Sequence, residues 1–186
     1  MKLLHIGDVV GAAGSRFLQE HLPAIKRTHK IDMIVVNGEN SAQGNGITKH
    51  SMEQIFSAGA DVITTGNHCF KRREAMAIYE NPVVLRPANY PEGCPGHGVC
   101  TIDFGPCQVA VLNLSGTAYL DPLDNPFTIA EQLLEEIDTP NILVDFHVIT
   151  IQAILIHLII ITPLVTTTLY TRISSSFVFS DSGISS

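Results

Sequence analysis

Four short polar motifs hold the side chains in this 186-residue chain that are best suited to chemistry. They are Gly7-Asp8, Gly38-Glu39-Asn40, Gly66-Asn67-His68 and Asp145-Phe146-His147. Carboxylates, amides and imidazoles are ligands of divalent metal ions, and two adjacent ions can stabilise the attacking and leaving oxygens of a displacement at phosphorus. If the motifs meet in the folded chain, they predict metal-assisted attack on a phosphate ester.

Each motif follows a short apolar run that is typical of a buried β-strand. The runs are residues 2–6, 31–36, 61–65 and 141–144. In an open α/β sheet the carboxyl ends of parallel strands share one edge, so residues just beyond those ends converge. We therefore expect a single site at that edge, built from Asp8, Glu39, Asn67 and His147.

Most of these residues, taken singly, also have ordinary structural roles. Asp8 would serve as a turn or helix-capping residue, and His147 as a hydrogen-bonded core residue. Glu39 is the least ordinary, because a carboxylate after an aliphatic strand is costly to bury without a cation or hydrogen bonds. Asn67 and His68 are neighbours whose side chains leave the backbone in different directions, which favours different tasks for them.

Longer blocks that contain these motifs resemble, in the same order, the YmdB-like branch of the calcineurin-type metallophosphoesterases. The blocks are Ile6-Gly7-Asp8-Val9-Val10-Gly11, Asn37-Gly38-Glu39-Asn40, Thr65-Gly66-Asn67-His68, Arg86-Pro87-Ala88-Asn89-Tyr90-Pro91 and Val144-Asp145-Phe146-His147. Members of that branch act as cyclic-nucleotide phosphodiesterases. The resemblance covers residues 1–147 and implies an αββα sandwich, in which helices flank two packed mixed β-sheets.

The resemblance also implies a centre with two divalent or mixed-valence metal ions, either iron or manganese. Its ligands would be Asp8, Glu39, Asn40, Asn67 and His147, with Glu39 as the bridge between the ions. In the implied hydrolysis of a 2′,3′-cyclic nucleotide, a metal-activated hydroxide attacks phosphorus and His68 protonates the departing ribose oxygen. Arg86 has two open roles, which are pairing with a surface carboxylate and contacting the substrate phosphate.

The elements that must position these residues alternate strand and helix over the first two-thirds of the chain. This alternation predicts an α/β fold with largely parallel strands. We expect helices after caps at Ser15 and Thr48, a helical segment at 71–79, and a helix from Pro126 through residue 137. The last helix would present one apolar face, made of Ile129, Leu133, Leu134 and Ile137. Residues 99–104 and 108–114 predict an antiparallel hairpin around Gly105-Pro106.

Beyond His147 the sequence changes character. Residues 148–186 hold only two charged side chains, Arg172 and Asp181, and are rich in Ile, Thr and Ser. The Gly-Thr-His-Thr-His block of the resembled family, which supplies two more metal-binding histidines, has no counterpart there. We therefore divide the chain into a metallophosphoesterase domain, 1–147, and an anomalous tail, 148–186. For this tail we weigh an altered reading frame or misassigned residues first, then genuine extra strands, then a membrane anchor.

The composition of the chain limits the kinds of partner that we expect it to bind. A formal net charge of −7 argues against general nucleic-acid binding and against binding to anionic membranes. A small phosphate ester remains compatible if metal ions supply the positive charge. We expect no membrane partner and leave a homo-oligomer open. Four cysteines without a Cys-x-x-Cys pair, and an N-terminus without a long apolar stretch, indicate reduced thiols in the cytoplasm.

Two alternatives remain open at this point. Cys94-x-x-His97-x-x-Cys100 offers zinc donors, but it lacks a fourth ligand at an obvious spacing. Because the tail lacks a His-x-His pair, we expect impaired phosphodiesterase activity, and a noncatalytic regulatory or nucleotide-binding α/β protein is the alternative function.

Overall fold

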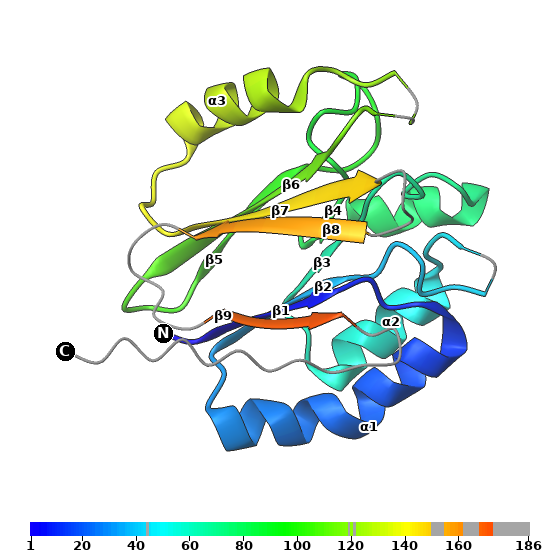
Figure 1. The fold of residues 1–186 in the computed structure, drawn as a ribbon, viewed down its shortest axis with the longest axis vertical. Helices are drawn as coiled ribbons and strands as arrows, with labels where there is room; N and C mark the ends of the chain where they lie inside the picture. Colours follow the sequence, from blue (N-terminus) through cyan, green and yellow to red (C-terminus); the bar gives the residue numbers. More distant parts are fainter. Residues whose placement is uncertain (44, 119, 121, 150–154, 162–167, 173–186) are drawn as a thin grey trace.

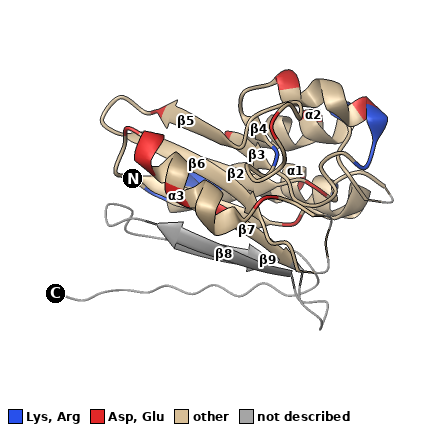
Figure 2. Cartoon of the chain, turned by 90° about the horizontal axis from the view of Figure 1, so that it is seen from above, with Lys and Arg blue, Asp and Glu red and all other residues tan. Residues whose placement is uncertain are grey.

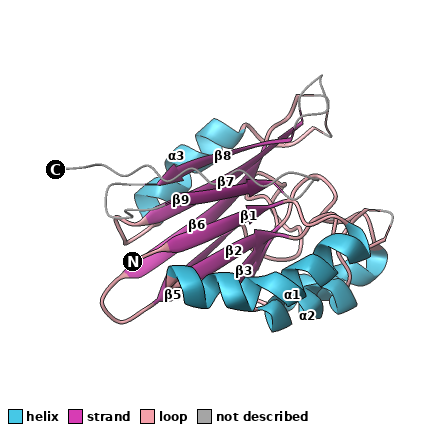
Figure 3. Cartoon of the chain, turned by 60° about the horizontal axis from the view of Figure 1, so that its bottom comes forward, coloured by secondary structure: helices cyan, strands magenta, loops and turns pink. Residues whose placement is uncertain are grey.

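Two β-sheets pack face to face in this protein, and helices cover their outer faces (Figure 1). The computed structural model describes residues 1–186 except 44, 119, 121, 150–154, 162–167 and 173–186. Helices α1 and α2 lie against the first sheet, whereas α3 lies against the second (Figure 3). This architecture confirms the predicted α/β fold with two packed sheets flanked by helices.

The first sheet has the strand order β4-β3-β2-β1-β9. Its strands are β1 (Leu3–Gly7), β2 (Met33–Asn37), β3 (Val62–Thr64), β4 (Val84–Leu85) and β9 (Thr168–Arg172). Every neighbouring pair recorded in it is parallel. The carboxyl ends of β1, β2 and β3 therefore share one edge, which is the edge that the first three motifs follow.

The second sheet has the order β5-β6-β7-β8 and is mixed. Its strands are β5 (Val99–Asp103), β6 (Gln108–Ser115), β7 (Ile142–Ile149) and β8 (Leu155–Ile161). β5 and β6 form the predicted antiparallel hairpin, β6 and β7 are parallel, and β7 and β8 are antiparallel. Of the segment 148–186, β8 and β9 are described, and most of the remainder lies outside the described residues.

The starts of the first two helices differ in how they are capped. Helix α2 (Lys49–Ala58) begins after Thr48, which accepts a hydrogen bond from the Ser51 backbone N–H as predicted. The predicted cap at Ser15 is wrong, because α1 (Gly11–His29) begins earlier and Val10 at its N-cap makes no side-chain hydrogen bond. The chain turns directly from the first motif into this helix, and the Gly11 N–H donates to the Asn40 carbonyl at 2.8 Å. A neighbouring loop thus satisfies a helix-end donor that a side chain usually satisfies.

The segment predicted at 71–79 forms a 3-10 helix, η1 (Arg73–Glu80), and α3 (Pro126–Glu136) begins at the predicted proline. Three residues of the proposed apolar face pack on the second sheet, namely Ile129, Leu133 and Ile137. Leu134 does not, since its side chain is 43% exposed. The acidic residues Glu131, Glu135 and Glu136 are exposed on the same helix (Figure 2). Among the described residues, no helix is long and apolar enough to cross a membrane.

The space between the sheets is mainly aliphatic, but it also contains buried polar contacts. The aliphatic layer includes Leu3, Met33, Val35, Val109, Val111 and Leu143. Within it, the fully buried Asp145 carboxylate of β7 accepts a 2.5 Å hydrogen bond from the Thr64 hydroxyl of β3. The same carboxylate oxygen lies 3.2 Å from Nε2 of the buried His5 on β1. Asp145 therefore ties the second sheet to two strands of the first.

Candidate active site

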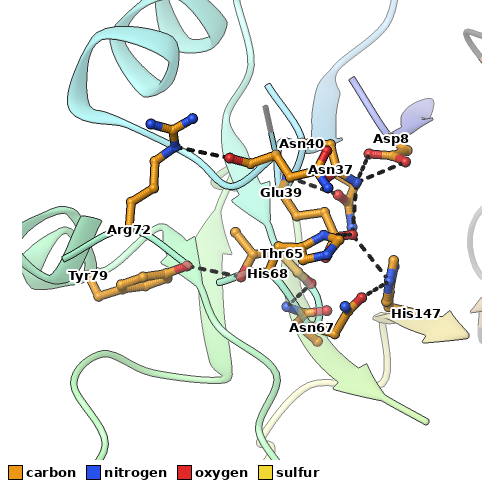
Figure 4. Close-up of polar contacts among 12 residues, drawn as sticks. Asp8, Asn37, Glu39, Asn40, Thr65, Asn67, His68, Arg72, Tyr79 and His147 are labelled. Atoms are coloured by element: carbon orange, nitrogen blue, oxygen red, sulfur yellow. Dashed lines mark hydrogen bonds and ion pairs between the residues drawn. The ribbon is translucent and has the colours of Figure 1, made fainter. Parts of the chain in front are cut away.

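The four motifs converge at one end of the two sheets, as Figure 4 shows for their labelled residues. Asp8, Glu39 and Asn67 follow β1, β2 and β3, so parallel pairing alone carries them to a common edge. His147 arrives differently, from within β7 of the second sheet. The site is therefore assembled across the interface between the sheets.

One half of the site joins the first and second motifs. The Asn40 amide nitrogen donates to both carboxylate oxygens of Asp8, at 3.1 and 3.2 Å, and to Oε1 of Glu39 at 3.0 Å. All three side chains are buried. Asp8 also has a positive φ of 33°, which is uncommon for a residue with a Cβ and bends the chain sharply after β1. An amide nitrogen thus lies between two buried carboxylates, where positive charge would be most favourable.

The other half joins Glu39 to the third and fourth motifs. Its Oε1 lies 3.3 Å from Nε2 of His147 and 3.5 Å from Nδ1 of His68. Nε2 of His147 is also 3.0 Å from the Asn67 side-chain oxygen. One oxygen of Glu39 is therefore within contact distance of Asn40, His68 and His147, which makes this carboxylate the centre of the cluster.

Gly66 gives this cluster its close packing. A Cβ at this position would lie 2.0 Å from Oε2 of Glu39 and 2.6 Å from the ring of His147. These distances are far below van der Waals contact, so the backbone passes the two side chains with no room to spare. The glycine of the Gly-Asn-His motif is required for this approach rather than for an unusual backbone angle.

The imidazoles of His68 and His147 have different surroundings. His147 is fully buried, whereas the His68 side chain is 24% exposed. The hydrogen-bonding and charge contact with Glu39 raises the pKa of His68 above its ordinary value, against partial burial, which lowers it. His68 is thus the imidazole of the cluster that faces outward.

The donor set suits a cation in its chemistry. Oε2 of Glu39 and Oδ1 of Asn40 are buried oxygens that have no hydrogen-bond partner among the described residues. An unpaired buried oxygen is costly unless a positive charge or donor satisfies it. Across the described part of the chain, no three His, Cys, Asp or Glu side chains form a metal-binding group. That statement applies to Cys94, His97 and Cys100 as well. The fit to a metal therefore depends on amide oxygens acting beside Glu39.

Arg86 lies against its own loop. Its Nη1 donates to the carbonyl oxygens of Pro87, at 2.8 Å, and of Ala88, at 3.4 Å. Asn89 in the same block is buried, donates to the Ser115 carbonyl at 2.8 Å and accepts from the Ser115 N–H at 2.9 Å. These contacts connect the loop after β4 to the end of β6, which is a structural role that sequence reasoning did not assign.

Comparisons with known proteins identify the family of the chain. The family model described as "YmdB-like protein" matches residues 4–153. The chain is 41% identical over 150 residues to the 2′,3′-cyclic-nucleotide 2′-phosphodiesterase of Bacillus subtilis, with 79% of this chain and 57% of that protein covered. This chain thus spans a little over half of the length of that relative.

Two solved structures share the fold. One is a hypothetical protein from Thermus thermophilus, with a TM-score of 0.76, 36% identity, and coverage of 82% of this chain and 60% of that one. The other is a novel phosphatase from Mycoplasma pneumoniae, with a TM-score of 0.75, 29% identity, and coverage of 81% and 56%. The resemblance of the motif blocks is thereby confirmed, and the chain belongs to the YmdB-like family.

Proposed function

We propose that the chain is a metal-dependent phosphodiesterase whose substrates are 2′,3′-cyclic nucleotides or related phosphodiesters. The observation that carries the proposal is the position of Glu39. One of its oxygens contacts both halves of the site, and the other is buried without a hydrogen bond from any residue that the structure describes. The relatives named for phosphodiesterase and phosphatase activity support the same reaction class.

Two metal ions, iron or manganese, would be held by the residues of the two halves. Asp8 and Asn40 would bind one ion, Asn67 and His147 the other, and Glu39 both. To act as a ligand through its oxygen, Asn40 has to turn its amide over, since its nitrogen now faces the carboxylates. When bound, such ions supply charge neutralisation at the phosphate and lower the pKa of water.

His68 is proposed to protonate the departing ribose oxygen. It comes from the same loop as Asn67 but is the outward-facing imidazole, so its ring remains accessible to a substrate seated at the cluster. The Glu39 contact holds the ring at the edge of the site rather than inside it. A leaving alkoxide is strongly basic, so a positioned proton donor contributes about 10²–10⁴-fold to its departure.

The direct test is hydrolysis of 2′,3′-cyclic AMP and of bis-p-nitrophenyl phosphate with and without Mn²⁺. Turnover should require the metal and be lost in Glu39→Gln, which keeps the size of the side chain but removes its charge. The proposal is contradicted if neither this chain nor a version with a His-x-His pair in its final segment shows metal-dependent turnover. Equal rates for Glu39→Gln and the unmodified chain would contradict it as well.

The composition of residues 148–186 favours an alternative function without turnover. Residues 148–186 contain a single histidine, His157, so they hold no His-x-His pair. We propose that the activity of residues 1–186 is low for this reason, and the second candidate function is nucleotide binding without turnover. A version with two histidines restored in the final segment should hydrolyse both substrates faster. Comparable rates from the two versions would show that the extra imidazoles are not needed.

The proposal also includes the partner of the chain and the compartment in which it acts. The partner is a small phosphate ester, and the place of action is the cytoplasm. The free state of Cys69, Cys94, Cys100 and Cys107 supports a reducing compartment.

A further inference from the structure

The loop at residues 65–69 carries Asn67 and His68, and side chains outside the four motifs hold both of its ends. Its interior is short: the Cys69 N–H donates to the Gly66 carbonyl at 3.1 Å, and the Lys71 N–H donates to the His68 carbonyl at 3.1 Å. These bonds form a tight turn but do not attach it to the rest of the protein. The attachment comes from β4, β6 and η1.

The first end of the loop is held from the second sheet. The side-chain nitrogen of the buried Asn113, on β6, donates to the Thr65 carbonyl at 2.8 Å and to the Leu85 carbonyl at 3.0 Å. The Thr65 hydroxyl itself donates to the Leu85 carbonyl at 2.8 Å. Thr65 is thus connected to strands of both sheets before the loop begins.

The second end is held by Tyr79, on η1. Its hydroxyl donates to the Cys69 carbonyl at 2.9 Å and lies 3.3 Å from the Thr65 hydroxyl oxygen, so one group spans the loop (Figure 4). The ring is 1% exposed and meets Phe70 edge to face, with centroids 5.2 Å apart. Burial raises the pKa of Tyr79, so the hydroxyl keeps the proton that it donates.

We propose that Tyr79 is a positioning residue for His68 and Asn67. The loop passes Glu39 and His147 with no room for a Cβ at Gly66, so a small displacement of its backbone alters the contacts of both side chains with the cluster. The Tyr79 hydroxyl restrains the loop against such displacement, because it donates to the Cys69 carbonyl at one end and lies beside the Thr65 hydroxyl at the other, and its ring is held by packing. The effect on catalysis rests on the function proposed above, whereas the effect on the loop does not.

Hydrogen exchange of Tyr79→Phe in the full chain tests the loop without any activity measurement. The variant keeps the ring and deletes only the oxygen that donates to the Cys69 carbonyl and lies beside the Thr65 hydroxyl. The Cys69 and Lys71 amides should exchange about tenfold faster, as expected when one intramolecular hydrogen bond is lost. Thr139→Val is the matched control, because it deletes a hydroxyl that donates to the Gln108 carbonyl at 2.9 Å, at the opposite end of β6. Unchanged exchange at both amides in Tyr79→Phe would overturn the proposal.

Comparing two substrates with different leaving groups gives a second test, because a merely structural role of Tyr79 would affect both substrates equally. Hydrolysis of 2′,3′-cyclic AMP needs a proton donor, whereas p-nitrophenolate leaves bis-p-nitrophenyl phosphate without one. Tyr79→Phe should therefore lower kcat for the cyclic nucleotide about tenfold more than for the aryl ester. Equal losses on both substrates would make Tyr79 a general stabilising residue and reject the positioning of His68. Absence of turnover by both the unmodified chain and the version with a His-x-His pair would contradict the proposed function, and the exchange result would still decide the loop.

Discussion

The two sheets contribute to the site in different ways. The first sheet provides three motifs from the ends of its parallel strands, where β1, β2 and β3 stop at Gly7, Asn37 and Thr64. The second sheet provides His147 from within a strand, next but one to the Asp145 that ties the sheets together. Strand order therefore suffices to gather one part of the site, whereas the other part depends on how the sheets pack.

The largest effect is expected at the loop after β3. In a version of the chain with a His-x-His pair in its final segment, His68→Ala should retain its metal but lose about 10²–10⁴-fold in turnover of a cyclic nucleotide, if the ring donates the leaving-group proton. Metal content by emission spectroscopy and kcat on the same samples separate the two roles. Loss of metal would make His68 a ligand, and unchanged turnover would reject both roles.

Substitutions of Glu39 and Asp8 should have different effects on metal affinity. Glu39→Ala is expected to weaken Mn²⁺ binding at both positions, by more than the roughly 10–100-fold typical of an outer-shell partner, because Glu39 contacts residues of both sheets. Asp8→Ala should weaken mainly one position, since its carboxylate meets the Asn40 amide in the first half of the site. Calorimetric titration of each variant gives the two constants. Independent, equal losses would argue against a bridge.

Gly66→Ala tests how closely the two sheets approach at the site. The new methyl would collide with Glu39 and His147, so we expect a loss of about 1–3 kcal/mol in the free energy of unfolding, as in overpacked cores. Gly116→Ala is the control, because its Cβ would meet Val148 at an ordinary 3.5 Å. Denaturant unfolding of both variants measures the difference. Equal stability of the two would show that the loop moves aside easily.

Asp145→Asn tests the tie between the sheets. Replacing a buried carboxylate that faces His5 and Thr64 removes a charged acceptor, so we expect a loss of about 1–3 kcal/mol in unfolding free energy. Asp138→Asn, at an exposed position before β7, should change stability by less than about 0.5 kcal/mol. An Asp145→Asn protein as stable as this control would mean that the Asp145 contacts are not needed to align the sheets.

The same contrast explains which features were predictable from the sequence. Apolar runs followed by polar motifs are local patterns, and the strands and the capped start of α2 were predicted from them. His5, Thr64 and Asp145 lie far apart in the sequence and meet only when the sheets pack, so no spacing signals their contact.

Other features were decided by contacts with residues distant in the sequence, which replaced the contacts that the local sequence predicts. Ser15 has the right side chain for a cap, but a carbonyl from the Glu39 loop satisfies the helix start and the helix begins before it. The Tyr79 hydroxyl meets the Cys69 carbonyl and the Thr65 hydroxyl, which lie ten and fourteen residues away, only in the folded chain. Leu134 matched the helical period, yet α3 turns it outward from the second sheet.

The absence of a side chain at Gly66 has a consequence for how this protein can change over generations. Every other amino acid carries a Cβ, so any single replacement at this position enters the space held by Glu39 and His147. Tolerating one would require coordinated changes in two strands and a loop from different parts of the gene. Substitution is therefore strongly disfavoured at this residue, and the spacing between the two sheets is inherited along with it.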